Sequence, residues 1–363
     1  MRAIEWVERA SGGHQGTVRF IDQTKLPNEE KYVETDDVEL LGESIRALRI
    51  RGAPAIGIAA GFGLVLAAQN ARTMSELRAA FDRASDLLAA TRPTAVNLFW
   101  SLRRMRSVFE NNSSSSSEIV QRALLSEANR MLREDEETCR MIGRHGAALV
   151  PQQASILTHC NTGALATGGD GTAQSVITAS VSEGKRIRVY IGETRPLLQG
   201  ARLTCWELVR AGVDVTLITD STAAFLLKQR KVDLILVGAD RIALNGDVAN
   251  KIGTYNLAVL AEKHRIPLYV AAPTSTIDFD LNSGEAIPIE ERDPREVTEI
   301  FGTKIAPEGV RVYSPAFDIT PHELITAIIT EAGILMSPFT DSIPRSGIKT
   351  FTKGSGPLKA RLP

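Results

Sequence analysis

Apolar residues recur at helical spacing through most of the first 150 residues. The spacing predicts one helix at Val38, Leu41, Ile45 and Leu48. It predicts further helices after Pro54 and over Met74–Ala90, Ala95–Phe109 and Glu118–Leu149. Before them, alternating apolar and polar residues predict short strands over Thr17–Asp22 and at Tyr32–Val33. We therefore expect residues 1–150 to form a mostly helical N-terminal domain with a small β element.

After Pro151 the pattern changes to short apolar runs that alternate with helical segments. The runs typical of buried strands are Ala154–Leu157, Ile187–Ile191, Val213–Ile218, Leu234–Val237, Leu268–Ala271 and Val310–Tyr313. Helices are predicted near Thr172–Glu183, Gln199–Ala211, Ala223–Lys228, Thr254–His264 and Pro321–Glu331. This alternation indicates an α/β fold, a Rossmann-like doubly wound parallel sheet over residues 151–340. The polar residues 341–363 are expected to be a loosely held C-terminal tail.

Composition narrows the functional classes. Hydrophobic residues are 43% of the 363 residues, so a large core can form. With 42 basic and 43 acidic residues the net charge is −1, which disfavours a nucleic-acid partner. The longest apolar segment, Ala53–Ala68, is interrupted by glycines and falls short of a membrane span. Three cysteines without a C-x-x-C pair, few histidines and no apolar signal segment predict a cytoplasmic protein without a structural zinc site or a disulfide framework.

Polar residues stand at the expected carboxyl ends of three predicted strands. They are Cys160 in ILTHCNTG, Glu193, Arg195 and Gln199 in GETRPLLQG, and Asp240 in DLILVGAD. In an open parallel sheet, ligands bind outside the carboxyl ends of the strands. Three such positions in one sheet indicate a site.

Two of these residues allow both a structural and a chemical interpretation. A free cysteine is commonly a small buried apolar residue. At a strand end among small residues, however, the sulfur of Cys160 is expected to be reachable, and the helix near Thr172 could lower its pKa. Asp240 could be a helix cap or a turn residue. Against an apolar strand it would instead be partly desolvated, which would raise its pKa and let it donate a proton. Cys139 and Cys205 are interpreted as core residues.

A phosphate site is predicted at RIRGAPAIG. Pro54 suits the first turn of a helix, and Gly52 would let a ligand approach the backbone. Free N–H groups at that helix start, together with Arg51, would bind an anion. The alternative is an ordinary helix start with a solvated arginine.

Other motifs support or exclude particular phosphate ligands. Arg92 precedes a proline at another predicted helix start, and NGDVANKIGTYN supplies Asn250 and Lys251. Together they suggest a phosphate or sugar-phosphate ligand. Gly163 begins a segment spaced like a phosphate loop, but Gly169-Asp170 stands where Lys-Ser/Thr is required. No G-x-G-x-x-G opens a helix after a strand, which argues against a nicotinamide cofactor.

Five long motifs resemble the methylthioribose-1-phosphate isomerase family. They are RIRGAPAIGIAAGFGL, TRPTAVNLFW, ILTHCNTGALAT, ETRPLLQGARLTCWEL and VGADRIALNGDVANKIGTYNLAVLA. The resemblance covers about residues 1 to 340. It implies a homodimer with a helical N-terminal and a Rossmann-like C-terminal domain. It also implies an aldose–ketose isomerase, an intramolecular oxidoreductase of methionine salvage that needs no cofactor and acts on 5-methylthio-α-D-ribose 1-phosphate.

The same resemblance implies roles for individual residues. The family's catalytic pair corresponds to Cys160 and Asp240. Its substrate-binding residues correspond to Arg51, Gly52, Ala53, Arg92, Gln199, Asn250 and Lys251. Two alternatives stay open. One is an isomerase of another ribose 1-phosphate, such as ribose 1,5-bisphosphate. The other is a non-enzymatic protein like the related regulatory subunits of the translation initiation guanine-nucleotide exchange factor.

Overall fold

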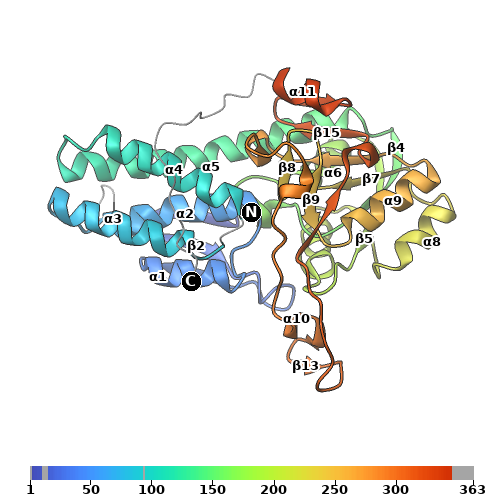
Figure 1. The fold of residues 1–363 in the computed structure, drawn as a ribbon, viewed down its shortest axis with the longest axis horizontal. Coiled ribbons are helices and arrows are strands. Elements are labelled where there is room, and N and C mark those ends of the chain that lie inside the picture. Colours follow the sequence, from blue (N-terminus) through green and yellow to red (C-terminus); the bar gives the residue numbers. More distant parts are fainter. Residues whose placement is uncertain (1, 10–14, 93–94, 346–363) are drawn as a thin grey trace.

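The elements form two groups that lie side by side along the long axis of the molecule (Figure 1). The computed structural model describes residues 2–9, 15–92 and 95–345. The first group has an antiparallel sheet of β1 (Ile4–Glu8), β2 (Gly16–Ile21) and β3 (Tyr32–Thr35). Its helices are α1 (Val38–Arg46), α2 (Ala53–Ala68), α3 (Met74–Ala89), α4 (Val96–Asn111) and α5 (Ser117–Ala147). The mostly helical character predicted for this part is confirmed, and β1 is an additional strand.

Helix α2 is the centre of the helical part. It is apolar around its whole circumference and buried almost throughout, as such a helix must be. Its glycines let neighbouring elements pack closely. A Cβ on Gly57 would lie 3.0 Å from the carbonyl oxygen of Asn97, and one on Gly63 would lie 3.0 Å from Leu88. The Ala- and Gly-rich composition of this segment is thus explained by close helix packing.

The second group is built on a seven-stranded sheet. Its strands are β4 (Gln153–Thr158), β5 (Arg186–Gly192), β6 (Asp214–Ile218), β7 (Leu234–Val237), β10 (Leu268–Ala271), β15 (Ala327–Thr330) and β16 (Gly333–Met336). The spatial order is β16-β15-β10-β7-β4-β5-β6, and all neighbours except β15 and β16 are parallel. For the six parallel strands this is the Rossmann order, in which the order of successive strands reverses between β4 and β7.

Helices cover both faces of this sheet, which confirms the doubly wound prediction. They are α6 (Ala173–Ser182), α7 (Cys205–Arg210), α8 (Thr222–Lys228), α9 (Thr254–His264) and α11 (Phe339–Arg345). On one face, Val176 of α6 packs in a core with Ile156 and with Ile142 of α5. On the other, Leu227 of α8 packs in a core with Ile235. Because α5 also contributes to the core of the helical part, this long helix connects the two groups.

A smaller sheet and an arm follow the ends of the main strands. The small sheet has the order β11-β8-β9-β14, with bounds Ile277–Asp278, Arg241–Ala243, Val248–Lys251 and Phe317–Thr320. The arm contains α10 (Arg295–Thr298), β12 (Glu299–Ile300) and β13 (Thr303–Lys304), and it projects from the body at the bottom of Figure 1. The sequence pattern predicted neither feature.

Two predicted elements were wrong. Val310–Tyr313 is not a strand, because it lies in the arm without strand partners and Tyr313 is 80% exposed. Pro321–Glu331 is not a helix, because Ala327–Thr330 is β15, paired with β10 and β16 inside the sheet. Apolar runs of this length fit either structure, and pairing between distant segments decides.

The chain end differs in part from the expected tail. Residues 341–345 belong to α11, whose Phe339 and Ile343 side chains are buried, while residues 346–363 lie outside the described part.

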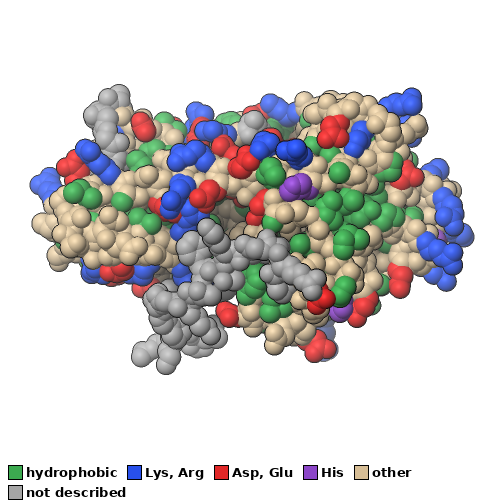
Figure 2. Space-filling model, turned by 90° about the horizontal axis from the view of Figure 1, so that it is seen from above, with side chains coloured by type: hydrophobic (Ala, Val, Ile, Leu, Met, Phe, Trp, Pro, Cys, Tyr) green, Lys and Arg blue, Asp and Glu red, His purple; other side chains and the backbone are tan. Residues whose placement is uncertain are grey.

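Across the described ranges, every helix is too short or too polar to cross a membrane. Basic and acidic side chains are interspersed over most of the face seen in Figure 2.

Candidate active site

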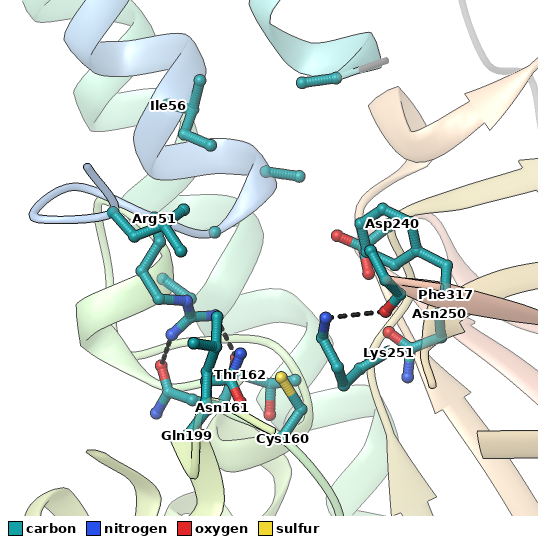
Figure 3. A pocket seen from close by; sticks show the side chains of 18 of the residues that line it. Arg51, Ile56, Cys160, Asn161, Thr162, Gln199, Asp240, Asn250, Lys251 and Phe317 are labelled. Atoms are coloured by element: carbon teal, nitrogen blue, oxygen red, sulfur yellow. Dashed lines mark hydrogen bonds between the residues drawn. The ribbon is translucent and has the colours of Figure 1, made fainter. Parts of the chain in front are cut away.

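A cavity of about 360 Å³ lies between the helical part and the carboxyl ends of the central strands. Its size is in the range of small-molecule sites. It is lined by all nine residues to which the family resemblance gave a role, namely Arg51, Gly52, Ala53, Arg92, Cys160, Gln199, Asp240, Asn250 and Lys251. In Figure 3 the sulfur of Cys160 lies between Arg51 on one side and Lys251 and Asp240 on the other.

The helical part presents the start of α2 to this cavity. Gly52 precedes the helix with a φ of 93°, and Pro54 lies in the first turn. A Cβ at Gly52 would lie 2.5 Å from the Cα of Ala166, so glycine is required for conformation and for space. The free backbone N–H groups of the first turn are therefore at the cavity wall, where they favour an anion.

Arg51 is held by one partner residue. Its Nη1 donates to Oδ1 of Asn161 over 2.6 Å, and its Nη2 donates to the carbonyl oxygen of Asn161 over 3.0 Å. These two bonds hold the guanidinium against the loop after β4 and leave other N–H groups available for a ligand. Arg51 is thus part of the cavity wall rather than a solvated surface charge. Asn161 was missed because asparagine in a loop is ordinary.

Cys160 follows β4 in a constrained backbone conformation. Its φ of 62° is unusual for a residue with a side chain. Its N–H donates to Oγ1 of Thr194 over 2.8 Å, and its carbonyl oxygen accepts from Oγ1 of Thr204 over 2.6 Å. Two threonines thereby fix the turn that aims the sulfur into the cavity.

The sulfur of Cys160 lines the cavity, but the pKa of its thiol is shifted in the direction opposite to the lowering that the sequence suggested. The residue is only 8% exposed, and burial raises its pKa, with Arg51 and Lys251 acting against the rise. Burial removes the water that would stabilise the charged thiolate, so the protonated thiol is favoured. Cys160 is therefore a neutral thiol in the resting protein.

Asp240 follows β7, the strand that pairs directly with β4. Its N–H donates to the carbonyl oxygen of Ala249 over 2.9 Å, and β8 follows it, so it is not a helix cap. Burial raises the pKa of its carboxyl, opposed by Lys251, Arg92 and Arg51. The direction is the one predicted from its place against an apolar strand. Cys160 and Asp240 thus both line the cavity, at the carboxyl ends of the two strands that flank the switch point of the sheet.

Lys251 and Asn250 enter from β9. The Nζ of Lys251 donates to the carbonyl oxygen of Ala316 over 2.7 Å and lies 4.9 Å from the centre of the Phe317 ring. Burial lowers the pKa of Lys251, while the negative charge of Asp240 opposes that change. Asn250 is buried and its Nδ2 donates to Oγ1 of Thr254 over 3.0 Å.

Two cavity residues carry buried polar atoms that the described protein does not satisfy. Oε1 of Gln199 and Nε of Arg92 have no hydrogen-bond partner among the described residues. Such atoms are rare in folded proteins, and in a cavity they suit a polar ligand. Arg92 also contacts Glu290 over 3.2 Å, and Glu290 in turn accepts from Arg292 over 2.8 Å. Pro93 itself lies outside the described residues.

Several predictions about neighbouring residues need correction. Arg195 does not line the cavity, because its Nη2 donates to the carbonyl oxygen of Val297 over 2.8 Å. Glu193 is also absent from the cavity wall, so of the three polar residues singled out in GETRPLLQG only Gln199 lines the cavity, next to Pro196, Leu197 and Leu198. Arg202, which the sequence analysis missed, enters from a π-helical turn after Gln199. Cys139 is buried as expected, whereas Cys205 is only partly buried.

One group of side chains in the described part has metal-ligand geometry. It consists of Asp247, His322 and Glu323, none of which lines the cavity. Asp247 already accepts hydrogen bonds from the backbone N–H groups of Gly284 and His322, at 2.9 Å each. This group is accounted for by the packing of the small sheet.

Comparison with known proteins gives a consistent result. Residues 49–337 match the Initiation factor 2 subunit family. A protein of Pelotomaculum thermopropionicum named methylthioribose-1-phosphate isomerase is 54% identical over 333 residues, which are 91% of this chain and 92% of that protein.

Two solved structures are similar over nearly the whole chain. The 5-methylthioribose 1-phosphate isomerase of Pyrococcus horikoshii OT3 has a TM-score of 0.88 and 46% identity, covering 95% of each chain. A structure described as the translation initiation factor eIF-2B, subunit delta, from A. fulgidus has a TM-score of 0.84 and 43% identity, covering 95% of this chain and 99% of that one. The chain therefore belongs to the initiation factor 2 subunit family, within which it groups with the methylthioribose-1-phosphate isomerases.

Proposed function

We propose that the protein interconverts 5-methylthio-α-D-ribose 1-phosphate and 5-methylthio-D-ribulose 1-phosphate, as a step of methionine salvage. The observation that carries this proposal is the meeting of Cys160 and Asp240 at the switch point, in a cavity that also holds Arg51, Arg92 and Lys251. A neutral thiol and a carboxyl with a raised pKa can move protons, while the cations can hold a phosphate. The names of the relatives support the same substrate.

The substrate explains why an acid is needed. An ordinary aldose opens its ring by losing the proton of the anomeric hydroxyl, but here phosphate esterifies that oxygen. Asp240 gives a proton to the ring oxygen as the bond from that oxygen to C1 breaks. The raised pKa of Asp240 keeps more of the carboxyl protonated for this step.

Cys160 acts in the hydrogen transfer that follows. One hydrogen moves from C2 to C1, and the C2 hydroxyl loses a proton as the ketone forms. A thiol held between Arg51 and Lys251 can relay that proton, taking it from the C2 hydroxyl while giving its own proton to the Asp240 carboxylate that ring opening left ionised (Figure 3). The hydrogen on C2 moves either through a cis-enediolate or as a hydride. Apolar cavity residues, among them Ile56 and Ile287, limit water around the reacting carbons and suit the methylthio group.

The function is tested with the purified protein and two sugar phosphates. Incubation with methylthioribose 1-phosphate should give the ketose 1-phosphate in phosphorus NMR spectra, and ribose 1,5-bisphosphate should be converted more slowly. Faster conversion of the bisphosphate would assign the chain to that substrate instead. No conversion of either would favour a non-enzymatic role in translation initiation, the process for which the similar A. fulgidus protein is named.

Replacement of Arg51 by lysine tests the phosphate site. The planar guanidinium holds Asn161 through two hydrogen bonds while facing the cavity, and an ammonium group cannot reproduce that fork. We expect kcat/KM to fall about tenfold or more, from the loss of a charge-assisted contact. The measurement is steady-state kinetics with methylthioribose 1-phosphate. An Arg51→Lys enzyme with full activity would return Arg51 to a structural role.

Chelation tests the proposed absence of a metal requirement. The cavity lining in the described part contains no cluster with metal-ligand spacing. Activity after exhaustive treatment with EDTA should equal that of the untreated enzyme. Loss of activity that a divalent ion restores would require a metal in the mechanism.

The remaining parts of the proposal follow from the family. We expect a homodimer, a cytoplasmic location and no cofactor. The near balance of acidic and basic residues supports a small-molecule substrate rather than a nucleic acid.

A further inference from the structure

A buried carboxylate lies behind the phosphate site and has no part in the proposed chemistry. Glu207 of α7 is 6% exposed. Its Oε1 accepts a hydrogen bond from the N–H of Leu165 over 2.9 Å, and its Oε2 accepts one from Nδ2 of Asn161 over 2.5 Å. Nδ2 of Asn161 also donates to Oγ1 of Thr204 over 3.2 Å. Glu207 is therefore joined to Arg51 through Asn161.

The chemistry of these groups makes the arrangement directional. An ionised carboxylate only accepts hydrogen bonds, so it draws the NH₂ group of Asn161 towards itself. The amide oxygen of Asn161 then has to face the other way, towards Nη1 of Arg51. If the amide turned over, its NH₂ group would face the guanidinium, and Arg51 would lose its acceptor.

We propose that Glu207 is a positioning residue that fixes the amide orientation of Asn161 and through it holds Arg51 at the phosphate site. The inference rests on the proposed function in assigning phosphate to Arg51. Both oxygens of Glu207 are occupied by donors, and one of these donors, the N–H of Leu165, belongs to the backbone. Space is also tight, since a Cβ on Gly163 would lie 2.4 Å from Oε2 of Glu207. The carboxylate thus has little freedom to choose other partners.

Ionisation of Glu207 is the condition for this role. Burial raises its pKa to about 7, against the lowering effects of Leu165, Asn161 and Arg51. Arg51 is the charged group that faces it, and its other near neighbours Asn161, Leu165, Ala164 and Gln174 are uncharged. Below that pKa one carboxyl oxygen of Glu207 carries a proton, and this O–H donor then faces a second donor, either the N–H of Leu165 or the NH₂ group of Asn161. Anion binding through Arg51 should therefore weaken as the pH falls through about 7.

Replacement of Glu207 by glutamine is the direct test. The glutamine side chain has a single acceptor oxygen, whereas two donors face it. The fixed backbone N–H of Leu165 therefore competes with the NH₂ group of Asn161 for that oxygen. Sulfate is a suitable probe, because it stays a dianion over the range from about pH 6 to about pH 8.5. At the upper end, Glu207→Gln should bind sulfate about tenfold more weakly than the wild type, the loss expected for a hydrogen bond to a charged group. Because Asp240 and Lys251 also titrate in the cavity with shifted pKa values, the readout is the ratio of the two affinities. The advantage of the wild type over the variant should shrink as the pH falls through about 7.

A matched control separates positioning from folding. Asp135 is a partly buried carboxyl whose pKa is also raised, to about 6, and it accepts from the N–H of Gly168 over 2.6 Å without contacting Asn161 or Arg51. Asp135→Asn should keep wild-type sulfate affinity. In an Arg51→Ala background, Glu207→Gln should weaken sulfate binding less than about twofold further, because the two residues act through one contact.

Stability gives a second, independent readout. A carboxyl whose pKa is raised on folding binds its proton more tightly in the folded state, so its ionised form lowers stability above that pKa. Glu207→Gln removes this titration, so the melting temperature of the variant should change less between about pH 6 and about pH 8 than that of the wild type. A purely structural role predicts a lower melting temperature with unchanged sulfate affinity.

The sulfate experiments can fail independently of the isomerase activity, so the positioning role and the proposed function are tested separately. Wild-type sulfate affinity at the upper pH in Glu207→Gln, or an unaltered pH dependence, would overturn the positioning role even in an active isomerase. A wild type that binds no sulfate would overturn it as well. If Glu207→Gln does not fold, Asn161→Ala replaces it and must bind weakly at every pH. An inactive wild type that shows the full sulfate pattern would overturn the isomerase and retain the positioning role.

Discussion

Cys160→Ser is expected to lower kcat at least about a hundredfold, the range for loss of a group that moves protons. Serine is close in size, and the contacts that fix the Cys160 turn come from its backbone, to Thr194 and Thr204. The turn should therefore keep its shape, and the melting temperature should change little. A hydroxyl gives up its proton much less readily than a thiol, so the transfer between C2 and C1 should slow. Steady-state kinetics and calorimetry measure the two effects.

Cys139→Ser is the matched control for this prediction. Cys139 is also buried, but it lies in α5 with its sulfur 3.9 Å from Asp135 and away from the cavity lining. Its replacement should leave kcat near that of the wild type, whatever it does to stability. Near wild-type turnover in Cys160→Ser would return Cys160 to the interpretation as a buried apolar residue, and Asp240 would then need another partner.

Asp240→Asn is expected to cause a loss of similar size. The amide keeps the shape and hydrogen-bonding capacity of the acid but cannot give a proton to the ring oxygen. A general acid works in its protonated form, so wild-type kcat/KM should fall as the pH rises above the raised pKa of Asp240. The Asn variant should lack that decline. Asp214→Asn, in an exposed pair with Arg188, is the control and should be fully active.

The double variant tests whether the two groups act as a unit. The charge of Asp240 raises the pKa of Cys160 across the switch point. If both serve one transition state, Cys160→Ser combined with Asp240→Asn should be scarcely slower than either single variant. If the double variant instead shows the product of the two single reductions in kcat, the groups act in independent steps, and the shared mechanism would have to be abandoned.

Local pattern was sufficient for most of the fold. The helices α1 to α5 and the strands β4, β5, β6, β7 and β10 were all predicted, because helical and buried-strand patterns are local properties of a sequence. The pattern failed at Pro321–Glu331, where the short apolar run Ala327–Thr330 is compatible with a helix and only pairing with β10 makes it a strand. It also failed at Val310–Tyr313, whose apolar residues lie in the exposed arm.

The sequence by itself also determined which side chains stand at strand ends and helix starts. That was enough to single out Arg51, Cys160 and Asp240, since a parallel sheet gathers such positions at one edge. The tertiary structure decided their surroundings. Burial in the assembled cavity raises the pKa of Cys160, against the lowering that the sequence suggested. Only packing joins Arg51 to Asn161, 110 residues later, and Asn161 to Glu207, a further 46 residues on. In CWELVR a glutamate has the appearance of a solvated helix residue. Its desolvation depends on chain segments far apart in the sequence, so no local pattern contains it.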